Sequence, residues 1–185
     1  MRIYRAESAA AFEEYANRCL YPGGEGCVYH VSPSVSVWTG QLATLDLAAC
    51  ERLGLEVGHG QYLGGSIVNM PGDLSICITT WGNSELAPQI VERMTERLQE
   101  LGGEVSMDEN DILVDGKKVL SWARATTLRG WCQSVIHCSI GPMDLDLVRE
   151  ICTKPTKKVP GSLGDYGVTA EELWSIGEPM IEEAV

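Results

Sequence analysis

An Asp-Gly pair divides two apolar runs in the segment NDILVDGKKVLSWA, residues 110–123. Asp-Gly between alternating apolar residues predicts a β-hairpin, because both turn residues adopt positive φ angles at little cost. We therefore expect one strand at 110–115 and a second at 117–125. Adjacent side chains of a strand face opposite sides of a sheet, so Lys117 and Lys118 cannot both enter a site on one face.

The same alternation predicts which hairpin side chains share a face. Ile112 and Val114 should lie on one face of the first strand, and Val119, Ser121 and Ala123 on one face of the second. Lysines beside such a turn are usually solvated, so the hairpin alone assigns no function to either lysine.

Hairpin connections dominate the rest of the expected sheet. Pro71-Gly72-Asp73 separates apolar runs at 64–70 and 74–80 and predicts a second hairpin, whose strands should share one sheet with those of the first. Such connections, with helices between them, indicate an α+β fold with a largely antiparallel mixed sheet flanked by helices. The other expected elements are strands at 27–31, 34–38 and 133–140, helices at 8–20, 44–53 with Thr44 as its cap, 86–101 and 144–152, and a last helix that begins at the capping box Thr169-Ala170-Glu171-Glu172.

Length, charge and cysteine content exclude several classes of protein. The chain has 185 residues, enough for one domain with a core, so we expect a single domain over residues 1–185. Its net charge of −12 repels phosphate backbones, which argues against a nucleic-acid partner. No apolar run approaches the roughly 20 residues of a membrane span, and the N-terminus lacks a signal-peptide pattern. Seven cysteines, an odd number, favour reduced thiols, and we expect a cytoplasmic protein without a membrane partner.

Several stretches occur in an order that points to one family. PSVSVWTGQ is followed by LGGSIVNMPGD, and a helix ending in LGGEV leads into the hairpin segment. VIHCSI, a DLDLV helix and KPTKKVPGS come next. In this order and spacing, residues 27–175 resemble the catalytic domain of the lipoate–protein ligase family, within the wider group that includes biotin protein ligases and octanoyltransferases.

The resemblance implies acyl transfer in two steps. The carboxylate of lipoate or octanoate would attack ATP, with Mg²⁺ on the phosphates, to give an acyl-adenylate and pyrophosphate. A lysine of a lipoyl domain or of another acyl-carrier protein would then attack the acyl carbonyl. We expect no accessory C-terminal domain of the kind that some members need, so a separate accessory subunit is a candidate partner.

The resemblance also implies the residues of a site. Gly64 and Gly65 match a Gly-rich loop, where glycine lets the ligand lie directly against the backbone. Asn110 and Asp111 match a pair at the nucleotide, with Asp111 at its metal end, and Lys118 matches a lysine that contacts the acyl carbonyl and the phosphate. The remaining residues implied at the substrate and the adenylate are Ser66, Asn69, Ser121 and His137, while Gln41 matches a glutamine that closes the first hairpin.

The sequence departs from the family pattern where phosphate is usually bound. The arginine that normally precedes the Gly-rich loop is absent from His59-Gly60-Gln61, and Asn69 replaces a histidine. His-Gly-Thr becomes His137-Cys138-Ser139. Residues 58–65 contain no arginine at all, which also disfavours biotin ligase chemistry.

These departures keep two other functions open. An octanoyl or lipoyl transferase would need no ATP, because a cysteine thioester takes the place of the adenylate. Its candidate nucleophiles are Cys132, Cys138 and Cys152, and a nucleophilic thiol needs a lowered pKa. The third interpretation is a non-catalytic protein that binds an acyl group, an adenylate or a protein partner.

Overall fold

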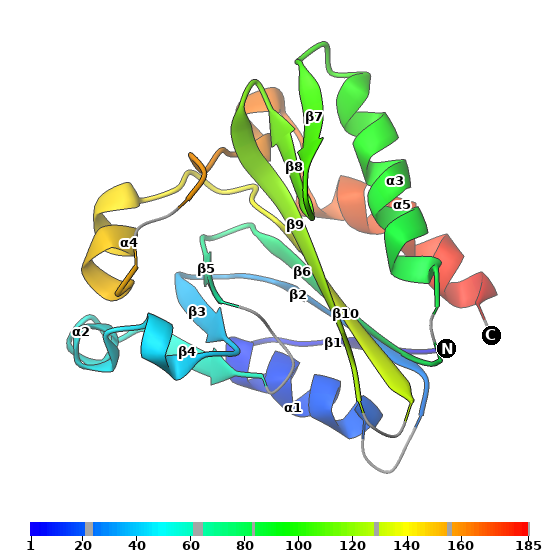
Figure 1. Ribbon diagram of the computed structural model, residues 1–185, viewed down its shortest axis with the longest axis horizontal. Coiled ribbons are helices and arrows are strands. Elements are labelled where there is room, and N and C mark those ends of the chain that lie inside the picture. Colours follow the sequence, from blue (N-terminus) through cyan, green and yellow to red (C-terminus); the bar gives the residue numbers. More distant parts are fainter. Residues whose placement is uncertain (21–23, 61–64, 83, 128–129, 155–156, 185) are drawn as a thin grey trace.

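A large and a small β-sheet form the centre of the molecule (Figure 1). The computed structural model describes residues 1–20, 24–60, 65–82, 84–127, 130–154 and 157–184. Every neighbouring pair of strands in the large sheet is antiparallel except β1 and β2, so the largely antiparallel α+β fold expected from the sequence is confirmed. Within the described ranges the seven strands of this sheet follow the order β1 (Arg2–Arg5), β2 (Gly26–Val31), β6 (Leu74–Trp81), β10 (Trp131–Cys138), β9 (Lys117–Thr126), β8 (Asp111–Val114) and β7 (Val105–Asp108).

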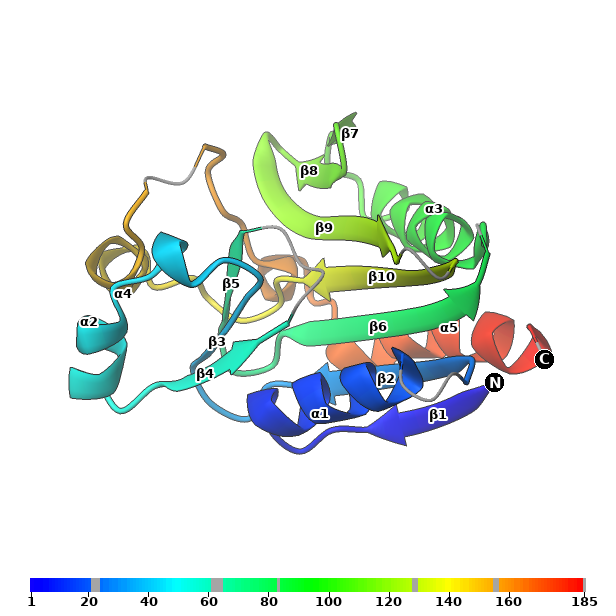
Figure 2. The same ribbon diagram turned by 60° about the horizontal axis from the view of Figure 1, so that its bottom comes forward.

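The small sheet lies beside the large one (Figure 2). Its central strand β3 (Ser36–Thr39) pairs in parallel with β4 (Glu56–His59) and antiparallel with β5 (Ser66–Asn69). The expected hairpin between 64–70 and 74–80 is therefore wrong, because β5 pairs with β3 while β6 pairs with β2 and β10.

The turn between β5 and β6 explains why they separate. The Oδ2 atom of Asp73 accepts a hydrogen bond from the Met70 N–H at 2.8 Å. Ser32 binds the turn twice, donating its N–H to the Asp73 carbonyl at 2.9 Å and accepting from the Gly72 N–H at 2.8 Å. Because the turn pairs with Ser32, the chain passes from the small sheet into the large one and does not fold back on β5.

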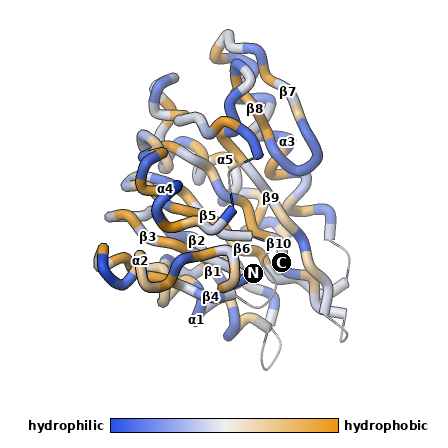
Figure 3. The backbone as a smooth tube through the Cα atoms, turned by 60° about the vertical axis from the view of Figure 1, so that its left-hand side comes forward, coloured by the Kyte–Doolittle hydropathy of each residue, from blue (hydrophilic) through white to orange (hydrophobic). Residues whose placement is uncertain are grey.

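Helices cover both faces of the large sheet (Figures 1 and 2). Helix α1 (Ala9–Leu20) packs against β2, β4 and β6, while α3 (Leu86–Gln99) and α5 (Ala170–Glu183) pack together over the other face. Ile76 and Ile78 of β6 join the core beneath α3 and α5, whereas Cys77 joins the core beneath α1. A strand covered on both faces is apolar at successive positions, which accounts for the hydrophobic strand segments in Figure 3.

The helix boundaries agree with the sequence patterns, with one correction. Helix α2 (Leu47–Arg52) begins at Asp46, whose side chain accepts the Ala49 N–H at 3.0 Å. Thr44 was expected to cap this helix, but it ends a separate 3₁₀ turn, Leu42–Thr44. Thr169 does cap α5, accepting the Glu172 N–H at 3.1 Å, as the capping-box pattern predicted.

Three short strands were not expected from the sequence. Strands β1, β4 and β7 have four residues each, and each includes a charged residue instead of a continuous apolar run. Helix α4 (Leu145–Ile151) lies at 144–152 as expected and packs with α2 against the small sheet.

Among the described residues, no helix combines the length and the apolar character that crossing a membrane requires.

Candidate functional site

A cavity of about 380 Å³ lies among β5, α4 and the β8–β9 hairpin. Its apolar lining comes from β5 and from the α4 region, through Ile67, Val68, Met143 and Val148. Lys118, Lys157 and Lys158 add positive charge to this lining. The cavity therefore suits a ligand that has both an apolar chain and an anionic group. The other lining residues are Gly65, Ser66, Glu109, Asp111, Ser121, His137, Ser139, Cys152 and Pro160.

Two lysines share one carboxylate in this cavity. The Nζ atom of Lys118 lies 3.0 Å from Oδ1 of Asp111, and that of Lys158 lies 2.8 Å from Oδ2 of the same residue. Lys158 also contacts the Asp108 carboxylate at 3.0 Å. Its hydrogen bonds with Asp111 and Asp108 raise the pKa of Lys158. An anionic ligand that enters the cavity therefore competes with Asp111 for two ammonium groups.

A β-bulge in β9 directs Lys118 and Ser121 to the cavity. The register between β8 and β9 shifts at this point, and Val119 has no counterpart on β8. Val119 and Leu120 are consequently both buried in the same core, while Lys118 and Ser121 both line the cavity. The expectation that Val119 and Ser121 share a face is wrong, because strict alternation fails at a bulge.

The segment after α4 brings Lys158 to Lys118 by pairing with this bulge. The Lys118 N–H donates to the Val159 carbonyl, and the Gly161 N–H donates to the Lys118 carbonyl, both at 2.8 Å. A Cβ atom at residue 161 would lie 2.8 Å from Cβ of Lys117, so glycine is needed for this close approach. Lys117 itself is exposed and does not line the cavity, so only one of the two adjacent lysines enters it, as strand alternation predicted.

A buried carboxylate supports the cavity wall at His137. Asp73 has no exposed surface, and its Oδ1 atom accepts the N–H groups of Ile140 at 2.6 Å and Gly141 at 2.8 Å. Burial raises the pKa of Asp73 to about 6, although backbone hydrogen bonds from Met70, Gly141 and Ile140 oppose that rise. Asp73 is thus mostly ionised at pH 7. It lies 3.8 Å from Nε2 of His137, beyond hydrogen-bonding distance.

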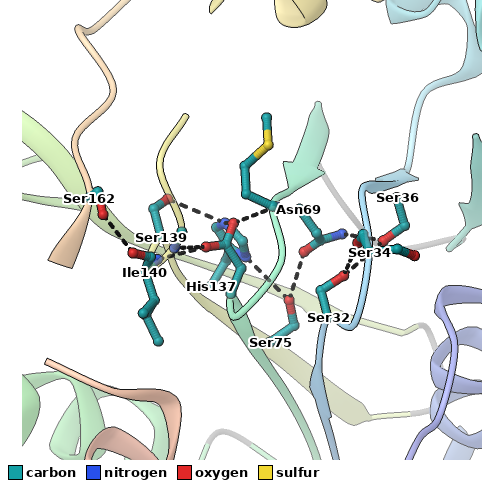
Figure 4. Close-up of polar contacts among 12 residues, drawn as sticks. Ser32, Ser34, Ser36, Asn69, Ser75, His137, Ser139, Ile140 and Ser162 are labelled. Carbon is teal, nitrogen blue, oxygen red and sulfur yellow. Dashed lines mark hydrogen bonds and ion pairs between the residues drawn. The ribbon is translucent and has the colours of Figure 1, made fainter. Parts of the chain in front are cut away.

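A chain of polar contacts runs from His137 to the small sheet (Figure 4). Ser75 Oγ lies 3.2 Å from Nδ1 of His137 and donates to Oδ1 of Asn69 at 3.3 Å. The Asn69 amide donates to Ser36 Oγ at 3.4 Å. Asn69, which we expected at the substrate, is therefore a buried member of this chain and does not line the cavity.

The cavity gathers most of the remaining residues expected at a site. Asn110 does not line it: the residue is exposed, and its carbonyl accepts the Trp122 N–H at 3.0 Å. Gly64 lies outside the described residues. The residues that the structure does bring together around the cavity are Gly65, Ser66, Asp111, Lys118, Ser121 and His137.

The three candidate cysteine nucleophiles have different surroundings. Cys132 and Cys138 are buried in β10 and do not line the cavity, and burial raises the pKa of the Cys138 thiol. Cys152 does line the cavity, but burial and the neighbouring Cys50 raise its pKa as well. Neither Cys138 nor Cys152 therefore has the lowered pKa of an activated thiol.

Three charged residues that line the cavity were not expected at the site: Glu109, Lys157 and Lys158. Lys158 belongs to KPTKKVPGS, which shows no helical or strand period, so nothing in that segment indicated which lysine would enter a site. Gly161 in the same segment permits a close backbone approach, but a glycine in a loop does not indicate which lysine that approach would position.

The sequence matches no protein-family model and no curated protein. Solved structures do match nearly the whole chain. A bipartite lipoate protein ligase from Thermoplasma acidophilum, described with its E2 lipoyl domain, superposes with a TM-score of 0.72 at 17% identity, covering 98% of this chain and 82% of that one. A lipoate-protein ligase A bound with ATP gives 0.73 at 18% identity, covering 98% and 84%.

This chain has the fold of a lipoate- or biotin-ligase catalytic domain. The wider group is represented by the biotin protein ligase from Leishmania major in complex with biotinyl-5-AMP, with a TM-score of 0.58 at 12% identity, covering 97% of this chain and 73% of that one. The cavity that contains Lys118 and Lys158 therefore lies in a chain with this fold. In its sequence, the chain resembles these ligases only in short motifs.

His137 should remain uncharged from pH 8 down to about pH 4. Burial, and then the charge of Lys118, lower its pKa to about 3 from 6.5. The unfolded state therefore binds a proton before the folded state does, so the stability that His137 contributes above pH 6.5 is lost as the pH falls from 6.5 towards 3. NMR titration of the three histidines, assigned with His137→Asn, measures this directly. A midpoint between pH 6 and 7 for His137 would contradict the buried environment.

Proposed function

We propose that this protein forms an acyl-adenylate from ATP and lipoate or octanoate, and then transfers the acyl group to a lysine of a carrier domain. The observation that carries the proposal is the placement of Lys118 and Lys158 on one carboxylate, in a cavity that also has apolar lining. An acyl-adenylate combines an apolar chain with a phosphate, which matches both features. Lipoate ligases among the structural neighbours, one of them bound with ATP, support the same chemistry.

The two steps place distinct demands on the cavity. First, a carboxylate oxygen attacks the α-phosphorus of ATP, and the bond to pyrophosphate breaks. Then the uncharged amine of the acceptor lysine attacks the acyl carbon, AMP leaves with the bonding electrons, and the new amide loses a proton. Negative charge on the phosphate oxygens is present in both steps. Lys118 and Lys158 would stabilise it as preorganised cations, and Lys158 would supply the charge that the absent loop arginine gives other members.

Mg²⁺ would be held by the nucleotide more than by the protein. Among the described residues, no group of three His, Cys, Asp or Glu side chains could hold a metal ion. Both oxygens of Asp111, the expected metal-end residue, contact lysines. Mg²⁺ commonly binds substrate phosphates with only one or two protein carboxylates, so these residues still fit Mg²⁺ carried on ATP.

An ATP-independent transferase is the second candidate, because Cys152 lines the cavity. In that reaction the Cys152 sulfur would attack the acyl carbon of a carrier thioester, releasing the carrier thiol, and the acceptor amine would then displace the enzyme sulfur. Its raised pKa makes Cys152 a weak nucleophile at neutral pH. Intact-mass analysis after incubation with an octanoyl-carrier protein would show an acyl-enzyme if this candidate were correct.

Exchange of labelled pyrophosphate into ATP tests the first step. We expect exchange that depends on Mg²⁺ and on lipoate or octanoate, followed by an amide on a lipoyl-domain lysine, detected by mass spectrometry. Omitting the acid is the control. Tight binding of an acyl-adenylate analogue without exchange or acyl-enzyme would contradict the proposal and indicate a non-catalytic binder.

We also propose that the protein acts in the cytoplasm. All seven cysteines are free in the structure, and free buried thiols are typical of a reducing compartment.

A further inference from the structure

A second hollow of about 460 Å³ adjoins the cavity at α4. Val148, Cys152, Lys157, Lys158 and Pro160 line both spaces. The additional walls of the hollow come from the exposed side of α4 and from the residues that follow it. A partner bound in the hollow would therefore lie next to the proposed adenylate.

The second hollow is a basic region on an acidic protein. Arg149, Lys154, Lys157 and Lys158 line it, and no described Asp or Glu does so. Arg149 contacts the exposed Asp146 at 3.0 Å, and Lys158 contacts the carboxylates of Asp111 and Asp108. Lys154 and Lys157 are exposed and form no ion pair with any described residue. Since the whole chain carries a net charge of −12, this is a local excess of positive charge.

Two apolar side chains also line the hollow at the surface. Leu145 is 38% exposed and Val159 is 59% exposed. A free polyphosphate would be held by the cations and would gain nothing from these side chains. Apolar contacts beside a charged rim are what a protein partner uses.

We propose that this hollow docks an acidic face of the protein that carries the acceptor lysine. This inference rests on the proposed function, which makes that lysine the acyl acceptor. An acidic partner is repelled by most of this surface and attracted at the hollow, so the charge distribution orients it there. Docking at the hollow places the acceptor lysine beside the first cavity, through the wall that the two spaces share.

Charge reversal in the hollow tests the docking. The probe is a lipoyl domain with carboxylates beside its acceptor lysine, and calorimetry at low salt gives its dissociation constant. Lys154→Glu and Arg149→Glu should each raise this constant about 10-fold, because each replaces an attraction with a repulsion. Lys117→Glu makes the same change in net charge at an exposed position outside the hollow, and it should have little effect. Equal affinities for all variants, or no measurable binding to the wild-type protein, would overturn the proposal.

A reciprocal change in the partner distinguishes docking from general charge effects. Replacing one carboxylate of the lipoyl domain by lysine should restore part of the affinity lost in Lys154→Glu and weaken binding to the wild-type protein. Pyrophosphate exchange, measured without the acceptor, should be unchanged by Lys154→Glu. If exchange falls while acceptor binding does not, the hollow holds the polyphosphate and the docking proposal is wrong. Absent exchange in the wild-type protein would count against the proposed function alone, because acceptor binding is measured without ATP.

Discussion

Replacing Lys118 by alanine should slow acyl-adenylate formation by about 100-fold to 1,000-fold, the usual cost of losing one preorganised electrostatic contact. The affinity for an acyl-adenylate analogue should weaken by roughly 1.5–3 kcal/mol, the scale of a hydrogen bond to a charged group. Thermal stability should be nearly unchanged, because the Lys118 side chain is 36% exposed and lines a cavity. Pyrophosphate exchange and thermal melts on the same preparation measure both effects.

The neighbouring lysine provides a matched control. Lys117→Ala removes the same side chain one residue away, at the exposed turn of the hairpin. It should change the free energy of unfolding by no more than about 0.5 kcal/mol and leave exchange nearly normal. Equal, small effects of both substitutions would mean that the two lysines form only a solvated turn. A larger effect at Lys117 would mean that the wrong side of the strand has been assigned to the site.

Asp73→Ala should destabilise the fold by about 3–5 kcal/mol, because two buried N–H groups and one part-buried N–H group lose their acceptor. Those groups belong to Met70, Ile140 and Gly141, and they connect the turn after β5 to the end of β10. For a chain of this length, the loss corresponds to a fall in melting temperature of about 10 °C. Urea unfolding of the wild-type protein and the variant gives the difference in free energy.

Asp73→Asn separates the loss of the acceptor from the loss of the charge. The asparagine oxygen can still accept from Ile140 and Gly141, so this variant should lose less stability than Asp73→Ala. Its pH dependence should also change. The folded pKa of about 6 lies above 3.8, so the Asp73 contribution to stability rises as the pH falls from 6 to 4 and opposes that of His137. Without Asp73, stability should fall more steeply below pH 6.5. A loss under about 1 kcal/mol for Asp73→Ala would contradict the role of its hydrogen bonds.

Patterns local in the chain were sufficient to predict much of this fold. The Asp-Gly turn predicted the β8–β9 hairpin, and apolar periodicity predicted α1, α3 and α5 within a few residues of their bounds. Both depend on interactions between residues close in the sequence, such as the capping of α5 by Thr169. The α+β architecture followed from the same elements.

Long-range pairing determined what the sequence could not show. The Pro-Gly-Asp turn does form, but its backbone groups bind Ser32, a residue about 40 positions earlier, and this sends β6 to a different sheet from β5. Turn chemistry alone does not specify the partner of the strand that follows.

The candidate site also combines a residue that local patterns predicted with a residue that only long-range pairing brings to it. Lys118 was predicted from its motif and from strand alternation, and it does line the cavity. Lys158 reaches the same carboxylate only because residues 159–161 pair with the bulge of β9, a contact between two segments that are separately irregular. Asn69 does not line the cavity, because hydrogen bonds with Ser36 and Ser75 hold its side chain in a buried position.

A structure of the protein with a non-hydrolysable acyl-adenylate analogue, such as an octanoyl sulfamoyl-adenosine, tests the central claim most directly. We predict that the group replacing the phosphate will lie within hydrogen-bonding distance of the Nζ atoms of Lys118 and Lys158, with the acyl chain against Ile67 and Val148. Asp111 should then no longer contact both lysines. An analogue bound elsewhere, or bound here with both lysines still on Asp111, would contradict the assignment of this cavity.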